Sequence, residues 1–444
     1  MASSTGGKAL GFWMCTALVV GNMIGSGVFL LPASLAVFGW NATLGWLVTI
    51  AGTMALAVVF ARLSRALPEA GGPYAYSQSA FGPALGFAVA WSYWLSVIVG
   101  NAAIAIGSVS YLSVLFPIIG QVRALPAVLT LAAIWSLTLL NCAGARTAGS
   151  FQALTTVLKL MPLTAIVVVA GIALSHGGSG LVLPFHASDI HLAGITSAAT
   201  LTLWALLGFE SATVPADKVK DPDRTISRAT LVGTSVTGLI YLAVCSAVML
   251  MLPAAMLRSS AAPLSDFLDR YWGGHSGGIL AVFATISSLG ALIGWVFLQG
   301  ELAWVMAVRG VFPAWFARTA ANGTPVRAHL MSSAILTLLV ATSFNRSLVD
   351  LFTFVILLAT TGSLFAYLFT ALAALKLQWL RTLERSALLA GLAIIGAVYS
   401  LWAIWGAGRE AAFWGLTAFL IAFPIYAGMR RSGQRVPEAS SSVH

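Results

Sequence analysis

A glycine-rich stretch inside the first long apolar segment has the spacing to bind a small zwitterion. The residues "GNMIGSG" (21–27) hold three glycines, and glycine weakens a helix and exposes its backbone. A helix that unwinds at membrane depth ends in free carbonyls and resumes with free amides. The carbonyls of Gly21 to Ile24 could hold an ammonium, and the amides of Ser26 to Val28 a carboxylate. This predicts an amino acid site, with a glycine-rich helix–helix contact as the alternative.

A second glycine interrupts a later apolar segment. In "LTLWALLGFESA" (201–212), Gly208 comes two residues before Glu210. The two interrupted segments are the first and the sixth of the chain. Such a pair is typical of an inverted-repeat transporter, in which discontinuous helices meet near the membrane midplane. The sequence therefore predicts that both breaks belong to one binding site.

Three ionisable side chains lie inside apolar segments, where such residues usually serve function. Glu210 is a candidate for gating or proton coupling, against a structural hydrogen bond to a neighbouring helix. Lys159, in "TTVLKLMPL", is a candidate functional cation, against an ion pair or carbonyl contacts that fix its helix. For Glu301 we favour a structural role near the membrane surface.

Two tryptophans stand beside small residues that leave room next to a large ring. Trp204 precedes the second break, and Trp295 lies in "LGALIGWVFLQG". The face of an indole attracts a cation, with about 2 kcal/mol or more when the pair is desolvated. Each ring is therefore a candidate contact for a cationic substrate, and ordinary packing is the alternative.

The composition indicates what kind of protein holds these residues. The chain of 444 residues is 59% hydrophobic and 8% charged, whereas soluble domains carry about 25% charged residues. An integral membrane protein is therefore expected. The net charge of +10 does not indicate a nucleic-acid partner, because the basic residues are scattered through short loops. The three isolated cysteines and six dispersed histidines lack metal-ligand spacing, so we expect no metal and no cofactor.

Twelve apolar segments are long enough to cross a membrane. The first is too long for a signal-peptide core and is expected to be retained. Of the 23 Lys and Arg residues, 17 fall on the side of both termini and five on the other, which predicts cytoplasmic termini. The segments are 10–38, 42–63, 84–115, 125–143, 151–174, 192–214, 226–252, 277–307, 328–345, 350–376, 386–405 and 409–429.

At these motifs the sequence resembles the amino acid–polyamine–organocation transporters, and most closely the basic amino acid/polyamine antiporters, a group that includes arginine/agmatine exchangers. The resemblance covers nearly the whole chain. The first and fourth of its motifs together are specific, whereas any one alone would be weak. The motifs are "GNMIGSGVFLLP", "GWLVTI", "GGPYAYSQSAFGPALG", "LTLWALLGFESA" and "FPAWFARTAANGTPV".

The resemblance implies an all-α membrane protein of twelve transmembrane helices, with a five-plus-five inverted repeat, broken helices 1 and 6, and two extra helices. The whole chain is then one transporter domain in a bacterial inner membrane, surrounded by lipid and paired as a homodimer. The implied parts are a first repeat over 1–174, a second over 175–377, the two additional helices over 378–429 and a cytoplasmic tail over 430–444.

The resemblance also assigns roles to individual residues. Met23, Ser26 and Gly27 would contact the backbone groups of the substrate. Contacts from the sixth segment would come from Trp204, which would also shield the site, and from Leu207. The side-chain end would meet the set Asn101, Trp295, Ser96 and Ala359. Gating would fall to Tyr93, Glu210 and Tyr367, and pH response to Tyr74, in the loop after the second segment.

Several positions depart from the arginine/agmatine exchangers. Ala359 replaces a serine near the guanidinium, and Ser96 and Val97 also alter the side-chain pocket. Lys159 replaces an apolar residue. Other amino acid transporters of the superfamily carry a lysine there, near where sodium-coupled relatives hold a cation. Lys159 therefore favours a sodium-independent mechanism, with the lysine as a fixed cation or a proton-coupling group.

Two functions follow as hypotheses. The first is an antiporter that exchanges a cationic amino acid for its decarboxylated amine, as arginine for agmatine. The second is a proton-coupled or exchanging transporter of neutral amino acids that uses Lys159. A channel is disfavoured because no polar ring or repeated carbonyl filter is present. An enzyme is disfavoured because no apolar segment pairs a nucleophile with a base.

Overall fold

The computed structural model describes residues 11–67, 72–122, 124–143, 146–210, 219–341 and 347–431, except for the side chains of 18, 146–157, 179, 222 and 223. Within this part of the chain, nine helices are long and apolar enough to cross a membrane. They are α3 (Trp40–Ala66), α5 (Pro83–Leu115), α7 (Leu125–Ala143), α8 (Arg146–Gly177), α10 (Pro222–Met251), α13 (Ser276–Val308), α15 (Leu348–Trp379), α16 (Ala387–Gly406) and α17 (Gly408–Arg431).

The first predicted segment is a bent pair of helices. Helix α1 (Phe12–Met23) and helix α2 (Gly27–Leu35) meet at an angle of 42°. Two shorter apolar helices, α9 (Leu192–Leu206) and α14 (Val326–Ala341), occupy the predicted segments 192–214 and 328–345. Because about 20 residues are needed to span the hydrocarbon core, the count of twelve transmembrane helices stays a prediction. The all-α membrane fold is confirmed.

Short helices fill several connections. They are α4 (Pro73–Phe81), α6 (Ile118–Gln121), α11 (Ala254–Ser259), α12 (Pro263–Tyr271) and three 3₁₀ turns at Gly178–Leu181, Ala187–Asp189 and Ala314–Ala317. The predicted loop position of Tyr74 is wrong, because Tyr74 lies on α4. Pro73 starts this helix at a position that needs no amide donor, and Gly82 (φ +88°) ends it.

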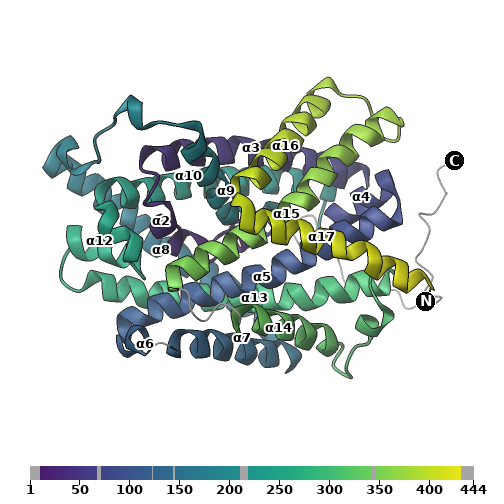
Figure 1. Ribbon diagram of the computed structural model, residues 1–444, viewed down its shortest axis with the longest axis horizontal. Coiled ribbons are helices and arrows are strands. Elements are labelled where there is room, and N and C mark those ends of the chain that lie inside the picture. Colours follow the sequence, from purple (N-terminus) through teal and green to yellow (C-terminus); the bar gives the residue numbers. More distant parts are fainter. Residues whose placement is uncertain are drawn as a thin grey trace.

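Helices α5 and α13 run side by side through the middle of the molecule, and α15 packs against α5 (Figure 1). Helices α7 and α14 lie along one edge, α16 lies toward the other, and α17 packs against α5 and α15 (Figure 1). Small residues allow close approach at the helix crossings. At Gly45 on α3, for example, an added Cβ would lie 2.9 Å from the Cβ of Ala198 on α9. This packing holds α9, and with it the second break, against the centre of the fold.

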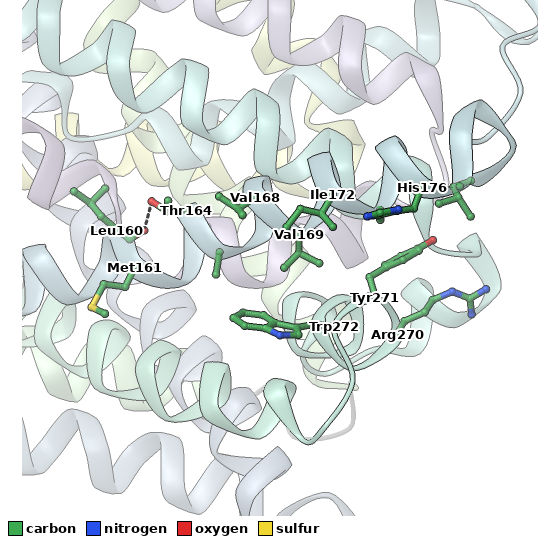
Figure 2. A pocket seen from close by; sticks show the side chains of 14 residues that line it. Leu160, Met161, Thr164, Val168, Val169, Ile172, His176, Arg270, Tyr271 and Trp272 are labelled. Atoms are coloured by element: carbon green, nitrogen blue, oxygen red, sulfur yellow. Dashed lines mark hydrogen bonds between the residues drawn. The ribbon is translucent and has the colours of Figure 1, made fainter.

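Helix α8 leaves much of one apolar face uncovered. Met161, Val168 and Ile172 are 54%, 53% and 54% exposed, and the face borders an open groove closed on its far side by the end of α12 (Figure 2). In a membrane protein, an exposed apolar face of this kind contacts lipid hydrocarbon.

Candidate functional site

The carbonyls of the first break are held by side chains from three other helices. The ammonium of Lys159 on α8 donates to the Gly21 oxygen at 3.1 Å. The indole of Trp295 on α13 donates to the Asn22 oxygen at 3.3 Å, and the hydroxyl of Tyr241 on α10 donates to the Met23 oxygen at 2.9 Å. Lys159 and Tyr241 are fully buried. These three bonds fix the end of α1. Among the carbonyls of Gly21 to Ile24, that of Ile24 accepts no hydrogen bond from the described residues.

The amides on the other side of the break are open. No described group accepts a hydrogen bond from the backbone N–H of Ser26, Gly27 or Val28, which form the first turn of α2. The Ser26 hydroxyl donates to the Ala103 oxygen on α5 at 3.2 Å, which fixes this turn in place. Three free donors at the positive end of a helix favour a carboxylate. The amides predicted from the sequence are therefore available for such a group.

Trp204 lies between two glycines of neighbouring helices. A Cβ added to Gly27 would come within 3.0 Å of the indole nitrogen, and one added to Gly100 on α5 within 3.0 Å of the far edge of the ring. The indole N–H has no hydrogen-bond acceptor among the described residues. Trp204 thus adds a fourth free donor beside the amides of α2, and glycine at both positions makes room for its ring.

The second break places a carboxylate between two tyrosines. Helix α9 ends at Leu206, the backbone extends at Leu207, and Gly208 adopts φ +100°, a conformation that favours glycine. The Glu210 carboxylate accepts from the Tyr93 hydroxyl at 2.6 Å, the Tyr367 hydroxyl at 3.0 Å and the Gly208 N–H at 3.2 Å. We refer to Glu210, Tyr93 and Tyr367 as the Glu210 cluster. The three residues predicted to gate are therefore in direct contact, although their role stays a prediction.

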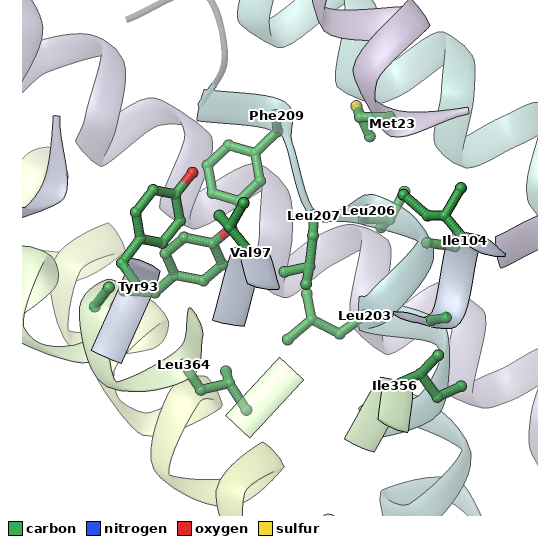
Figure 3. Close-up of a cluster of buried hydrophobic side chains, with 14 of the residues drawn as sticks. Met23, Tyr93, Val97, Ile104, Leu203, Leu206, Leu207, Phe209, Ile356 and Leu364 are labelled. Carbon is green, nitrogen blue, oxygen red and sulfur yellow. The ribbon is translucent and has the colours of Figure 1, made fainter. Parts of the chain in front are cut away.

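A small cavity lies between the two breaks. Its walls are Tyr93, Ser96, Val97, Gly100, Trp204, Leu207, Glu210, Trp295 and Ser363. Figure 3 shows three of these walls, Tyr93, Val97 and Leu207, within the buried apolar cluster that also contains Phe209. Only about 10 Å³ is open to the centres of water-sized molecules, which is the space of about one water. An amino acid can therefore bind here only when some of these walls move.

The side-chain end of the predicted pocket lies between α5 and α15. The Ser96 hydroxyl is hydrogen-bonded to the Ser363 hydroxyl at 2.5 Å, and Ser92 donates to the Gly362 oxygen at 2.9 Å. Ala359 is fully buried one turn before Ser363. Ser363 therefore provides a hydroxyl on the helix face where Ala359 lacks one.

A chain of hydrogen bonds fixes how the Asn101 amide is turned. The Asn101 N–H₂ donates to the Gln299 side-chain oxygen at 2.9 Å and to the Trp295 backbone oxygen at 3.3 Å. The Gln299 N–H₂ donates to the Ser333 hydroxyl at 3.0 Å, which pairs with the Thr138 hydroxyl at 2.7 Å. We refer to Asn101, Gln299, Ser333 and Thr138 as the Asn101 chain.

Backbone carbonyls set the direction of this chain, because a carbonyl can only accept. Thr138 donates its one hydroxyl proton to the Ile134 oxygen at 2.7 Å, so it accepts from Ser333. Ser333 then accepts from Gln299, and Gln299 accepts from Asn101. The Asn101 side-chain oxygen is left buried, without a partner in the described part of the chain. Asn101 follows Gly100, a cavity wall, but does not itself line the cavity, so its oxygen is a fixed acceptor beside the cavity that suits a positively charged donor.

Some of the predicted residues line the cavity and others, including Asn101, Ala359 and Tyr367, do not. Of the predicted residues, Ser96, Trp204, Leu207, Trp295, Tyr93 and Glu210 line the cavity. Met23 and Lys159 lie at the first break outside its walls, and Glu301 is half-buried on α13. The Tyr74 hydroxyl accepts from the Arg309 guanidinium at 3.4 Å, which ties α4 to the residue that follows α13 rather than to the cavity.

Sequence reasoning missed four contributors. Gly100 and Ser363 line the cavity, Tyr241 holds the first break, and Gln299 orients Asn101. Ser363 could have been found as the residue one helical turn after Ala359, and Gln299 as a polar side chain four residues after Trp295 on the same helix face. Tyr241 carries no such signal, because a tyrosine in an apolar segment usually packs or lies at a membrane surface.

Comparison with known proteins places the chain in a family. The sequence model described as "Amino acid permease" matches residues 10–429. The cadaverine/lysine antiporter of Escherichia coli K12 is 33% identical over 339 residues, which cover 75% of this chain and 74% of that protein. A putative arginine/ornithine antiporter of Bacillus subtilis is 32% identical over 432 residues (89% and 91%), and the putrescine transporter PotE of Haemophilus influenzae 30% over 420 residues (94% and 96%). The chain therefore belongs to the amino acid permease family of membrane transporters, within the amino acid–polyamine–organocation superfamily.

Proposed function

We propose that this protein is an antiporter that exchanges a cationic amino acid for its decarboxylated amine. The observation that carries the proposal is the Asn101 side-chain oxygen, a buried acceptor whose orientation is fixed by the Asn101 chain. A buried acceptor without a partner costs about 1–3 kcal/mol, and an ammonium or guanidinium can satisfy it. A neutral aliphatic side chain cannot.

The two breaks complete the proposed binding mode. The free amides of Ser26 to Val28 and the Trp204 indole N–H would bind the carboxylate of the amino acid, and the Ile24 oxygen its ammonium. The amine product lacks the carboxylate but keeps both cationic ends. Both substrates of an exchange can therefore use the acceptors, and only the amino acid uses the free donors.

Exchange of an amino acid for its decarboxylated amine would have a physiological effect on the acidity of the cell. Decarboxylation consumes a proton, so entry of the amino acid coupled to exit of the amine removes acid from the cell. The relatives are named for lysine with cadaverine, which is its decarboxylated amine, for putrescine, and for arginine with ornithine, which is an exchange of two cationic amino acids. We propose a pair of this class, with arginine and agmatine as one candidate.

Lys159 supports a second candidate function. Its ammonium is fully buried and bonded to the Gly21 oxygen, next to the proposed position of the substrate. A cation held there by the protein replaces the need for a bound metal cation. A proton-coupled or exchanging transporter of neutral amino acids would use it in this way.

The proposal includes the setting of the protein. The distribution of Lys and Arg supports cytoplasmic termini in a bacterial inner membrane, and the family resemblance supports a homodimer with 1–174 and 175–377 as inverted repeats.

A liposome exchange assay tests the function. Purified protein is reconstituted into vesicles loaded with agmatine, cadaverine, putrescine or buffer alone, and labelled arginine, lysine or alanine is added outside. We expect uptake of a labelled cationic amino acid to be at least tenfold faster into vesicles loaded with its amine than into buffer-loaded ones. Equal uptake into buffer-loaded vesicles would overturn exchange, and alanine as the fastest substrate would favour the Lys159 alternative.

A further inference from the structure

We propose that the outer face of α8 binds one anionic phospholipid with two acyl chains. The site consists of two neighbouring grooves that share Met161, Ala165 and Trp272, and that have volumes of about 1130 and 480 Å³. We call them groove A and groove B. Neither belongs to the transport site.

Groove A follows α8 along its length. From Leu160 to Ile172 its wall is almost entirely apolar and extends about 18 Å along the helix. One leaflet of the hydrocarbon core is about 15 Å thick, so this wall matches the length of one acyl chain. Groove B continues on the other side of Trp272, against Leu268, Ile279 and Phe283. The exposed indole of Trp272 (65%) thus separates two apolar channels, which also share Met161 and Ala165, on the part of α8 away from Arg270.

One end of groove A is basic. Figure 2 shows His176, Tyr271 and Arg270 gathered there, beyond Trp272 and at the opposite end from Leu160 and Met161. The Arg270 guanidinium lies 5.9 Å from the centre of the Tyr271 ring, and Tyr271 is fixed through its hydroxyl to the Met251 oxygen at 2.7 Å. An arginine fork in this position can bind a phosphate with two hydrogen bonds.

The acidic residues of α12 do not cancel this charge. No Asp or Glu is among the residues that line either groove. Asp269 accepts from the Gly277 N–H at 2.8 Å, and Asp266 accepts from the Ser260 hydroxyl at 2.5 Å. Burial raises the pKa of Asp266, against the opposing effect of the Ser260 hydrogen bond. Lipid tails are as apolar as the helix side chains, so selection among lipids must come from the charged end and from the two-channel shape.

Native mass spectrometry of the full chain in detergent tests the proposal without any transport measurement, so its outcome is independent of the exchange assay. The probes are dioleoyl phosphatidylglycerol, dioleoyl phosphatidylcholine, lyso-phosphatidylglycerol and glycerol phosphate. We expect phosphatidylglycerol to bind most tightly, its single-chain form more weakly, and glycerol phosphate not to compete. The absence of a preference for phosphatidylglycerol over phosphatidylcholine would overturn the anionic site, and equal binding of the single-chain form would overturn the two-groove site.

Variants locate the binding. Arg270→Gln should weaken phosphatidylglycerol about fivefold, the effect of one basic residue near an anionic lipid, and leave phosphatidylcholine unchanged. Arg409→Gln removes an exposed arginine that lines neither groove and should have no effect. Val168→Trp fills groove A from an exposed position and should weaken both diacyl lipids. Equal losses for Arg270→Gln and Arg409→Gln, or no loss for Val168→Trp, would refute the site.

Discussion

The two helix breaks are stabilised in opposite ways. At the first, Lys159, Tyr241 and Trp295 reach in from three helices and donate to carbonyls of the broken helix. At the second, the break carries its own carboxylate, and Glu210 reaches out to tyrosines on α5 and α15. Three separate contacts fix the carbonyls of the first break, which we call the frame of the proposed binding site. The second break is held through one carboxylate with two tyrosine partners, so we expect this contact to be released as a unit.

The comparison predicts that the largest effects arise at the Glu210 cluster. Tyr93→Phe removes the 2.6 Å hydrogen bond, and bonds to charged groups contribute about 1.5–3 kcal/mol. We expect exchange to become faster or leaky by tenfold or more, with substrate affinity little changed, because the closed arrangement is weakened rather than the frame. Exchange rates and binding isotherms separate the two effects.

Tyr76→Phe is the matched control, since the Tyr76 hydroxyl makes no hydrogen bond within the described residues and its ring is also buried. If Tyr93→Phe lowers substrate affinity and leaves the exchange rate unchanged, Tyr93 belongs to the binding frame. The contrast drawn between the two breaks would then be wrong.

The next largest effect is expected where the Trp204 ring packs against Gly27 of the first break. Gly27→Ala puts a methyl group 3.0 Å from the Trp204 indole nitrogen, and overpacking of this kind costs about 1–3 kcal/mol. We expect substrate affinity to fall about tenfold, measured by the thermal shift that the substrate produces. Gly25→Ala is the control in the same break, because its nearest neighbour would be Ile104 at 3.9 Å. Equal losses at both glycines would mean that backbone freedom, and not room for Trp204, is what matters.

A smaller effect is expected at a single contact of the frame. Tyr241→Phe removes the hydrogen bond to the Met23 oxygen, with a net contribution of about 0.5–1.5 kcal/mol. Affinity should fall severalfold while the exchange rate at saturating substrate stays constant. Tyr271→Phe removes a similar hydroxyl-to-carbonyl bond far from the break and should leave affinity unchanged. A changed rate in Tyr241→Phe would show that the frame itself moves.

The smallest effect tests the Asn101 chain at its far end. Thr138→Val takes away the acceptor of the Ser333 proton, so the direction of the chain is less strongly fixed. We expect the preference for cationic over neutral substrates to fall two- to threefold, which is about 0.5 kcal/mol. Thr130→Val is the control, because Thr130 lies on the same helix and its hydroxyl bonds only to the Pro126 oxygen among the described residues. If both variants keep the full preference in competition assays, the chain does not set it.

Hydropathy predicted most of the fold. Each of the twelve predicted segments overlaps an observed helix, and the predicted 125–143 coincides with α7. The glycines also located both breaks. Gly208 adopts a left-handed backbone conformation, and Gly27 lies so close to Trp204 that a side chain would not fit without a shift. Helices α4, α11 and α12 were missed, since their sequences are short and mixed in polarity, and their stability depends on packing against the membrane helices.

The site was predicted in part. The resemblance assigned Tyr93, Glu210 and Tyr367 together, and the structure joins them by hydrogen bonds. What the sequence could not give is which carbonyls are already occupied. The carbonyls of Gly21, Asn22 and Met23 were all expected to be open, yet each accepts from a side chain more than a hundred residues away. Contacts of that range depend on the helix packing and leave no local pattern.

The direction of the Asn101 chain has a consequence for how substrate preference is inherited among homologues. The orientation of the Asn101 amide, beside the cavity, is set by hydroxyls on α14 and α7 that line no part of it. We therefore expect two proteins with identical pocket walls to differ in specificity when position 138 or 333 changes. Classifications of these transporters by pocket residues alone would group such proteins together, whereas including positions 138, 299 and 333 would separate them.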